Sequence, residues 1–159
     1  MQKDASLRLD TEEFRAWIDA PVAVQVAACG ENLRPQSVRA FGVSFDAAGA
    51  LQVALLDAQC PLLLVALRVG RPVAVNLTHP LTFLGRQLKG PVLELEEPSL
   101  EAALAAQRYF DRFVQVLAKI GMTPEQCRGM FHTGPARFLR MQPSELFDQT
   151  PGASAGARL

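Results

Sequence analysis

Residues 71–90 have the sequence RPVAVNLTHPLTFLGRQLKG, and the two strand patterns within this segment decide the fold. In the first pattern, valine and leucine alternate with alanine, asparagine and threonine. A period of two residues is typical of a β-strand with one buried face. A turn, HPLT, then leads into a second pattern, in which glutamine and lysine share one face of the strand and arginine and leucine share the other. The segment therefore predicts two successive strands that both carry polar side chains.

The polar side chains of these two strands require hydrogen-bond partners. Asn76 and Thr78 share a face of the first strand, while the cations Arg86 and Lys89 lie on the second, and residues 58–93 contain no acid. An anionic ligand with polar ring edges or hydroxyl groups would satisfy them. Alternatively, these residues form a solvated face whose lysine and arginine keep an edge strand soluble. The pattern alone leaves both interpretations open.

The rest of the chain predicts further short elements. Alternation of apolar residues predicts strands over residues 22–28, 37–45, 51–55 and 136–142, and the second strand of the opening segment extends over 84–96 with a bulge or bend at Gly90–Pro91. Helical spacing and capping residues predict helices over 11–19 with Thr11 as N-cap, 60–69, 99–121 and 123–129, and a helical turn at PSELFD, residues 143–148.

This order of elements favours a mainly β (α+β) fold. Six strands, mostly antiparallel, with a crossover helix and a bent long strand predict a small β-barrel or curled sheet with flanking helices. We expect a single domain over residues 1–159, with tails at 1–10 and 150–159.

Composition excludes several classes of function. The 159 residues contain 16 Lys+Arg and 16 Asp+Glu, so the chain lacks the basic excess of a nucleic-acid-binding protein. Its three cysteines and two histidines are scattered and match no metal site. The start of the chain lacks the apolar run of a signal peptide, and no apolar run is long enough for a membrane span. We therefore expect a soluble, cytoplasmic protein.

Two motifs carry a resemblance to a known family. The opening segment resembles the central part of pyridoxamine-5′-phosphate-oxidase-like, FMN-binding split-barrel proteins, whose members often run from a strand of the form rVAv to QLKG. The run FLRMQPSELFDQTPG (138–152) resembles a segment of uncharacterised bacterial members. The order of elements agrees over residues 20–150. This resemblance implies a split β-barrel that forms a homodimer, with two FMN sites at the subunit interface.

The resemblance also implies which residues contact the cofactor. The phosphate partners would be Arg86 and Lys89, and Arg39 lies on the strand where the oxidases place a phosphate-binding arginine. The ribityl or ring contacts would be Gln87, Thr82, Thr78 and Asn76. The residues that approach the flavin of the other subunit would be His132, Arg137, Phe147 and Gln149. No catalytic residue is identified.

The chain departs from the family at one motif. The oxidases usually carry a Ser-Arg-Lys phosphate-binding run before the crossover helix, where this chain has LLDAQCP with Asp57. The leading hypothesis is an FMN-dependent oxidoreductase that acts on an unidentified small molecule. The departure motivates an alternative, a non-enzymatic module with the same dimeric barrel that binds a flavin, haem or small anion. A third hypothesis is a dimeric interaction domain without a ligand.

Overall fold

The computed structural model describes residues 12–159, so the predicted tail at 1–10 and the predicted N-cap Thr11 lie outside the described residues. The helical segments are α1 (Glu12–Asp19), the 3-10 turn η1 (Asp57–Gln59), α2 (Pro61–Ala66), α3 (Leu100–Ala118) and α4 (Pro124–Arg128). The strands are β1 (Ala23–Cys29), β2 (Pro35–Ala40), β3 (Val43–Phe45), β4 (Leu51–Leu56), β5 (Pro72–Thr78), β6 (Gly85–Leu95), β7 (Ala136–Met141) and β8 (Glu145–Asp148).

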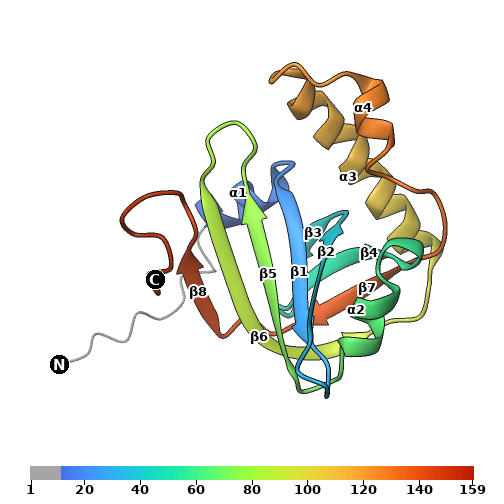
Figure 1. Ribbon diagram of the computed structural model, residues 1–159, viewed down its shortest axis with the longest axis vertical. Coiled ribbons are helices and arrows are strands. Elements are labelled where there is room, and N and C mark those ends of the chain that lie inside the picture. Colours follow the sequence, from blue (N-terminus) through green and yellow to red (C-terminus); the bar gives the residue numbers. More distant parts are fainter. Residues whose placement is uncertain (1–11) are drawn as a thin grey trace.

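One curled antiparallel sheet contains all of these strands. Its order is β2-β1-β5-β6-β7-β4-β3, and β8 also pairs with β6. The first half of β6 pairs with β5 and β8 and its second half pairs with β7, so this long strand curves from one side of the sheet to the other (Figure 1). The predicted mainly β fold with flanking helices is confirmed, and the sheet, as paired, is not closed.

The predicted count of six strands is wrong, for two local reasons. The strand expected over 37–45 is broken into β2 and β3 at Phe41–Gly42, where Gly42 has a positive φ of 130°. The segment PSELFD, expected to be a helical turn, instead forms β8, because Leu146 enters the core opposite Leu88 of β6. The bulge expected at Gly90–Pro91 is also displaced, since β6 runs through this dipeptide and its register with β7 shifts between Val92 and Glu94.

The core lies inside the curl of the sheet. The inward residues of β1, β5 and β6 are fully or almost fully buried and are Val24, Val26, Val73, Val75, Leu77 and Leu88. Helix α3 begins at the predicted N-cap Ser99, whose side chain accepts a hydrogen bond from the Ala102 backbone N–H. Its apolar side packs on β4 and β7. Among residues 12–159, no helix combines the length and the apolar character needed to cross a membrane.

Three arginines join strands of the C-terminal half to acids far away in the sequence. Arg137 of β7 donates from Nε and Nη2 to the two carboxylate oxygens of Asp57, at 2.8 and 2.7 Å. Arg140 joins Asp46 of the β3–β4 turn to Glu94 of β6. The third, Arg86 of β6, pairs with Asp148 of β8. Since bidentate pairs fix geometry as well as charge, these contacts set how the strands lie against each other.

Gly90 is where β6 passes closest to another backbone segment. A Cβ atom at this position would lie 1.8 Å from the carbonyl oxygen of Gln142, in the connection between β7 and β8. On either side, the Gln142 N–H donates to the Pro91 carbonyl and the Ser144 N–H donates to the Lys89 carbonyl. Only glycine fits here without a shift of one backbone segment.

We expect Gly90→Ala to lower the free energy of unfolding by about 3 kcal/mol or more, since overpacking against backbone is relieved only by moving a strand. Urea unfolding followed by circular dichroism measures the change. Gly129→Ala is the matched control, because Gly129 has a helical φ of −68° and its nearest neighbour atom would be 3.9 Å away. That control should change the stability by less than about 1 kcal/mol. Equal effects of the two substitutions would contradict the close approach.

Candidate functional site

The polar positions of the central strands align on the outer face of the sheet. In cross-strand register, Gln25 of β1 lies between Arg39 of β2 and Asn76 of β5, and Asn76 lies opposite Gln87 of β6. Gln87 in turn lies opposite Phe147 of β8. We call Gln25, Asn76 and Gln87 the amide band. Directly opposed side chains on one face of a sheet lie about 5 Å apart, so three neighbouring strands present amide groups side by side.

A cavity opens on the same face, two residues further along the strands. Its volume is about 570 Å³, and we call it the Lys89 pocket. Its floor includes Ala27 and Ala74, which are register neighbours and share the face of the amide band. The other lining residues include Cys29, Pro35, Gly70, Arg71, Lys89 and Glu145. Small side chains on two neighbouring strands leave the space, and mostly apolar walls suit a ring system.

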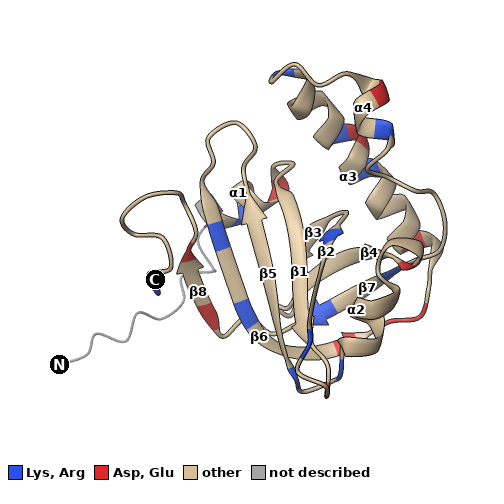
Figure 2. Cartoon of the chain, in the orientation of Figure 1, with Lys and Arg blue, Asp and Glu red and all other residues tan. Residues whose placement is uncertain are grey.

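The Lys89 pocket has a surplus of positive charge. Among the described residues, Arg71 and Lys89 form no ion pair with a carboxylate, and the Lys89 ammonium lies 4.4 Å from the centre of the Phe147 ring. The acid that lines the pocket, Glu145, already pairs with Arg158 at 3.4 Å. Figure 2 shows cations along β6 and acids at the ends of β8. Two cations beside an apolar cavity attract anionic groups.

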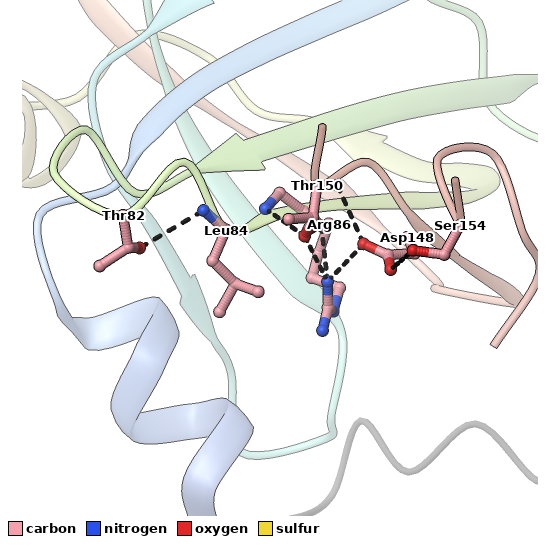
Figure 3. Close-up of polar contacts among 7 residues, drawn as sticks. Thr82, Leu84, Arg86, Asp148, Thr150 and Ser154 are labelled. Atoms are coloured by element: carbon pink, nitrogen blue, oxygen red, sulfur yellow. Dashed lines mark hydrogen bonds and ion pairs between the residues drawn. The ribbon is translucent and has the colours of Figure 1, made fainter. Parts of the chain in front are cut away.

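Arg86, a predicted phosphate partner, is instead part of an ion pair on the core side of β6. Its Nη1 donates to the Asp148 carboxylate at 2.7 Å, to the Gly85 carbonyl at 2.8 Å and to the Thr150 hydroxyl at 3.1 Å. Asp148 also accepts from the Thr150 N–H and the Ser154 hydroxyl (Figure 3). Arg86 and Lys89 point to opposite sides of β6, because Arg86 shares the face of Leu88. We call Arg86, Asp148 and Thr150 the C-terminal clamp.

The structure brings some of the other predicted residues to the outer face. Thr78 lies next to the amide band, and its hydroxyl accepts a hydrogen bond from the Asn76 amide at 3.3 Å. Gln149 lies against β6, where its backbone N–H donates to the Gly85 carbonyl. Thr82 is exposed in the β5–β6 turn, and its hydroxyl accepts from the Leu84 N–H. The hydroxyl of Thr82 therefore organises the turn.

Three predicted residues lie elsewhere. His132 is exposed in the connection between α4 and β7, and Arg137 is held by Asp57. Arg39 occupies the β2 end of the row that contains the amide band, but its guanidinium lies over the Phe113 ring of α3, at 5.6 Å. The Arg39 Nη1 atom is buried and has no hydrogen-bond partner among the described residues. It is thus an unsatisfied buried donor in this region of the sheet.

The environment of Cys60 does not suit a nucleophile. Cys60 is fully buried, and desolvation raises the pKa of its thiol to about 11, with the nearby Asp57 carboxylate as the second cause. A thiol with such a pKa is protonated at neutral pH and is a poor nucleophile. Cys127 is buried and Cys29 is exposed at the wall of the Lys89 pocket.

The residues of the outer face fit a planar ligand that carries a phosphate or carboxylate. The place before α2 where the oxidases carry their phosphate-binding run does not fit, because Asp57 is there and its charge is already neutralised by Arg137. Of the cations that line the cavity, Arg71 and Lys89 form no ion pair among the described residues, and they lie beside an apolar cavity and the amide band. FMN, with its flat ring and terminal phosphate, has this combination of features.

Sequence reasoning missed two residues of the site. Gln25 lies between Ala23 and Ala27 on the face of β1 that points away from the core, and the alternation of that strand already indicated this orientation. Arg71 lies directly before β5 and lines the cavity, although only its charge was visible in the sequence. Its position depends on the path from α2 to β5, which includes Gly70 with a φ of 79°.

Comparison with known proteins identifies the fold. No protein-family model matches the sequence, and no similar curated protein is found. Among solved structures, HupZ of Group A Streptococcus matches with a TM-score of 0.54 at 14% identity, over 92% of this chain and 98% of that one. An F420 reductase matches with a TM-score of 0.54 at 12% identity, over 86% and 97%. The conserved hypothetical protein Rv2991 of Mycobacterium tuberculosis matches with a TM-score of 0.51 at 16% identity, over 99% and 98%.

At these identities the likeness concerns the fold. Each of the three proteins is covered almost completely, so the similarity includes the whole arrangement of sheet and helices. The expected similarity to the pyridoxamine-5′-phosphate-oxidase-like split barrels is thereby confirmed at the level of the fold.

The C-terminal clamp predicts that the stability of the fold changes with pH in the acid range. Hydrogen bonds from the Thr150 backbone and side chain lower the pKa of Asp148 from 3.8 to about 2. A carboxyl group with a lowered pKa in the folded state contributes stability above its ordinary pKa, and this contribution is lost as the pH falls towards 2. We therefore expect Asp148→Asn to lower the melting temperature at pH 7 and to flatten its dependence on pH between 4 and 2.

Differential scanning fluorimetry over this pH range measures both effects. Asp111→Asn, on the exposed side of α3, is the control and should keep the slope of the unaltered protein. Parallel curves for Asp148→Asn and the unaltered protein would show that the clamp does not titrate as described.

Proposed function

We propose that the protein is an FMN-binding flavoprotein that holds its cofactor on the outer face of the sheet. The observation that supports this proposal best is the Lys89 pocket, a cavity of about 570 Å³ beside the amide band whose two cations form no ion pair with a carboxylate among the described residues. Solvent-exposed ion pairs contribute little, but cations at the mouth of an apolar cavity select strongly for an anionic ligand.

In this proposal each part of the face has one task. Arg71 and Lys89 bind the phosphate, because they are the cations that line the pocket and they form no ion pair with a carboxylate in the described chain. The amides of Asn76 and Gln87 bind and orient polar groups of the ring edge or the ribityl chain, with Thr78 as a further donor. The small residues Ala27 and Ala74 leave room for the ring against the strands. When bound, FMN supplies hydride or electron transfer.

We further propose an oxidoreductase that acts on an unidentified small molecule as a single-domain homodimer. A protein described as an F420 reductase has the same fold over 86% of this chain, which supports a redox function. The chain contributes binding, orientation and exclusion of water at the pocket. Arg39, whose Nη1 is a buried donor without a partner, is the residue best placed to bind a further polar group at the β2 end of the sheet.

A second candidate function is binding without turnover. No histidine lines the Lys89 pocket, and its acid, Glu145, is held in an ion pair. Among the described lining residues, Lys89 and Cys29 are the remaining side chains that could transfer a proton, and the proposal assigns Lys89 to the phosphate. A module that stores or senses a flavin, haem or other apolar anion needs only the cavity and its cations.

Titration with FMN tests the proposed site. We expect the unaltered protein to bind FMN with quenching of the flavin fluorescence, and Lys89→Gln and Arg71→Gln each to weaken binding by about tenfold or more, since a hydrogen bond to a charged group contributes about 1.5–3 kcal/mol. Lys119→Gln, at the exposed end of α3, is the control with unchanged affinity. Failure of the unaltered protein to bind FMN would overturn the proposal. Unchanged binding by both pocket variants would show that FMN binds elsewhere on the protein.

Anaerobic addition of NADPH or NADH to the FMN complex separates the two candidate functions. Loss of the visible flavin absorption, at a rate above that of free FMN, is expected for an oxidoreductase. Flavin that stays oxidised with both reductants would favour the binding module.

A further inference from the structure

We propose that a groove beside α3 binds a linear zwitterion, a small molecule with a carboxylate at one end and an ammonium group at the other. The groove has a volume of about 290 Å³ and lies between α3, the end of α1 and the strands β3 and β4. We call it the α3 groove. It shares no lining residue with the Lys89 pocket, so it is separate from the proposed FMN site and does not depend on it.

Small residues leave the space at the floor of the α3 groove. Gly42 directly precedes β3, and a Cβ atom at this position would lie 3.7 Å from the Cβ of Ala54 and 3.8 Å from the carbonyl oxygen of Ala105. Tyr109 of α3 also lines the groove, and its hydroxyl group already donates to the Val22 carbonyl. Small side chains and the face of a ring suit the methylene groups of a linear ligand.

One end of the α3 groove is positively charged. Arg108 and Arg112 are four residues apart on α3, and neither forms an ion pair with a carboxylate in the described part of the chain. Two like charges at this spacing repel each other on a helix. The acid between them in sequence, Asp111, accepts a hydrogen bond from the Gln107 amide. Asp19 also lines this end, but two arginines against one carboxylate leave a net positive charge.

The two arginines can bind a carboxylate together. Arg112 donates from Nη2 to the backbone carbonyl of Asp19, the last residue of α1, and this bond holds the guanidinium at the groove. The Arg108 guanidinium forms no hydrogen bond within residues 12–159, so its donors are available. A carboxylate that accepts from both side chains would relieve their repulsion and form charge-assisted hydrogen bonds.

The other end of the α3 groove is negatively charged. Glu101, in the first turn of α3, lines the groove and forms no ion pair with a described residue. The pKa of the Glu96 carboxyl group is raised by burial and then by the charge of Glu94, and Glu101 adds to this effect while Arg140 opposes it. Glu101 therefore lies among other acids, where an ammonium group would be attracted and would reduce their mutual repulsion.

The distance between the two ends determines the kind of zwitterion. Glu101 and Arg108 are about two turns apart on α3, which corresponds to about 10 Å along the helix axis. An α-amino acid carries its two charges on neighbouring atoms and would reach one end only. A phosphate or a dicarboxylate would bring a negative charge towards Glu101. An ω-amino carboxylate, with a methylene chain between its charges, can contact both ends.

The wall opposite α3 provides polar groups between the charged ends. Ser44 of β3 and Gln52 of β4 are register partners, and both line the groove. A hydroxyl and an amide at this place can bind a ligand group that is not charged, such as the amide of a dipeptide. The ligand class therefore includes ω-amino carboxylates and short peptides.

Calorimetric titration with ε-aminocaproate tests the proposed ligand class. We expect saturable binding of this probe and binding weaker by about tenfold or more of caproate, which lacks the ammonium group, and of hexylamine, which lacks the carboxylate. No saturable binding of ε-aminocaproate at millimolar concentration would overturn the inference. Equal affinity for caproate or for hexylamine would also overturn it, because one end of the groove would then contribute nothing.

Substitution of each end tests the residues. Arg108→Gln and Glu101→Gln should each weaken the binding of ε-aminocaproate by about tenfold or more, because each removes one charged partner. Arg34→Gln and Glu31→Gln are the matched controls, since both residues are exposed in the β1–β2 hairpin, and they should keep the affinity of the unaltered protein. Melting temperatures check that the variants fold. Unchanged affinity in either groove variant would contradict the proposed contacts.

Backbone amide NMR of the unaltered protein locates the ligand without any substitution. Addition of ε-aminocaproate should shift the resonances of Gly42, Ser44 and Ala105 and leave those of Ala27 and Ala74, in the Lys89 pocket, in place. The same shifts are expected with FMN present, since the two sites are separate. Shifts at Ala27 and Ala74 without shifts at the α3 groove would overturn the inference.

Discussion

The close passage of β6 beside the β7–β8 connection at Gly90 is the constraint on which the rest of the structure depends. One half of β6 belongs to the sheet of β5 and β8 and the other half pairs with β7, so the curl of the whole sheet occurs along this strand. Backbone hydrogen bonds at Lys89 and Pro91 fix the strand on both sides of the glycine. The Lys89 side chain therefore leaves a rigid backbone, which holds its ammonium group at the pocket.

The charges of the chain are arranged by the fold and not by proximity in sequence. Residues 58–93 contain no acid, and Arg86 from this segment is nevertheless neutralised by Asp148, more than sixty positions away. Arg137 and Asp57 are matched over a similar separation. These long-range pairs neutralise Arg86 and Arg137, whereas Arg71 and Lys89 at the pocket and Arg39 of β2 form no ion pair among the described residues.

The sequence predicted the fold class and most elements, because alternation and capping residues are local signals. Ser99 marked the start of α3, and the pattern around Asn76 placed the polar face correctly. Local signals could not show that Glu145–Asp148 would pair with the free edge of β6, because a segment of four residues is too short to display a clear alternation of apolar and polar side chains. Local signals also could not show that Arg86 and Lys89 have different roles, because the acid that pairs with Arg86 comes from a distant segment of the chain. The FMN site stays a prediction.

The pairing of β6 also has a consequence for the order in which the chain is made. Its two partners on one edge, β7 and β8, are synthesised after every other strand of the sheet. During translation, therefore, β6 presents unpaired N–H and carbonyl groups along this edge while β5 already covers the other. An open strand edge is a template for pairing between nascent chains, so aggregation during synthesis should be the first failure of any variant that delays the arrival of β7 and β8.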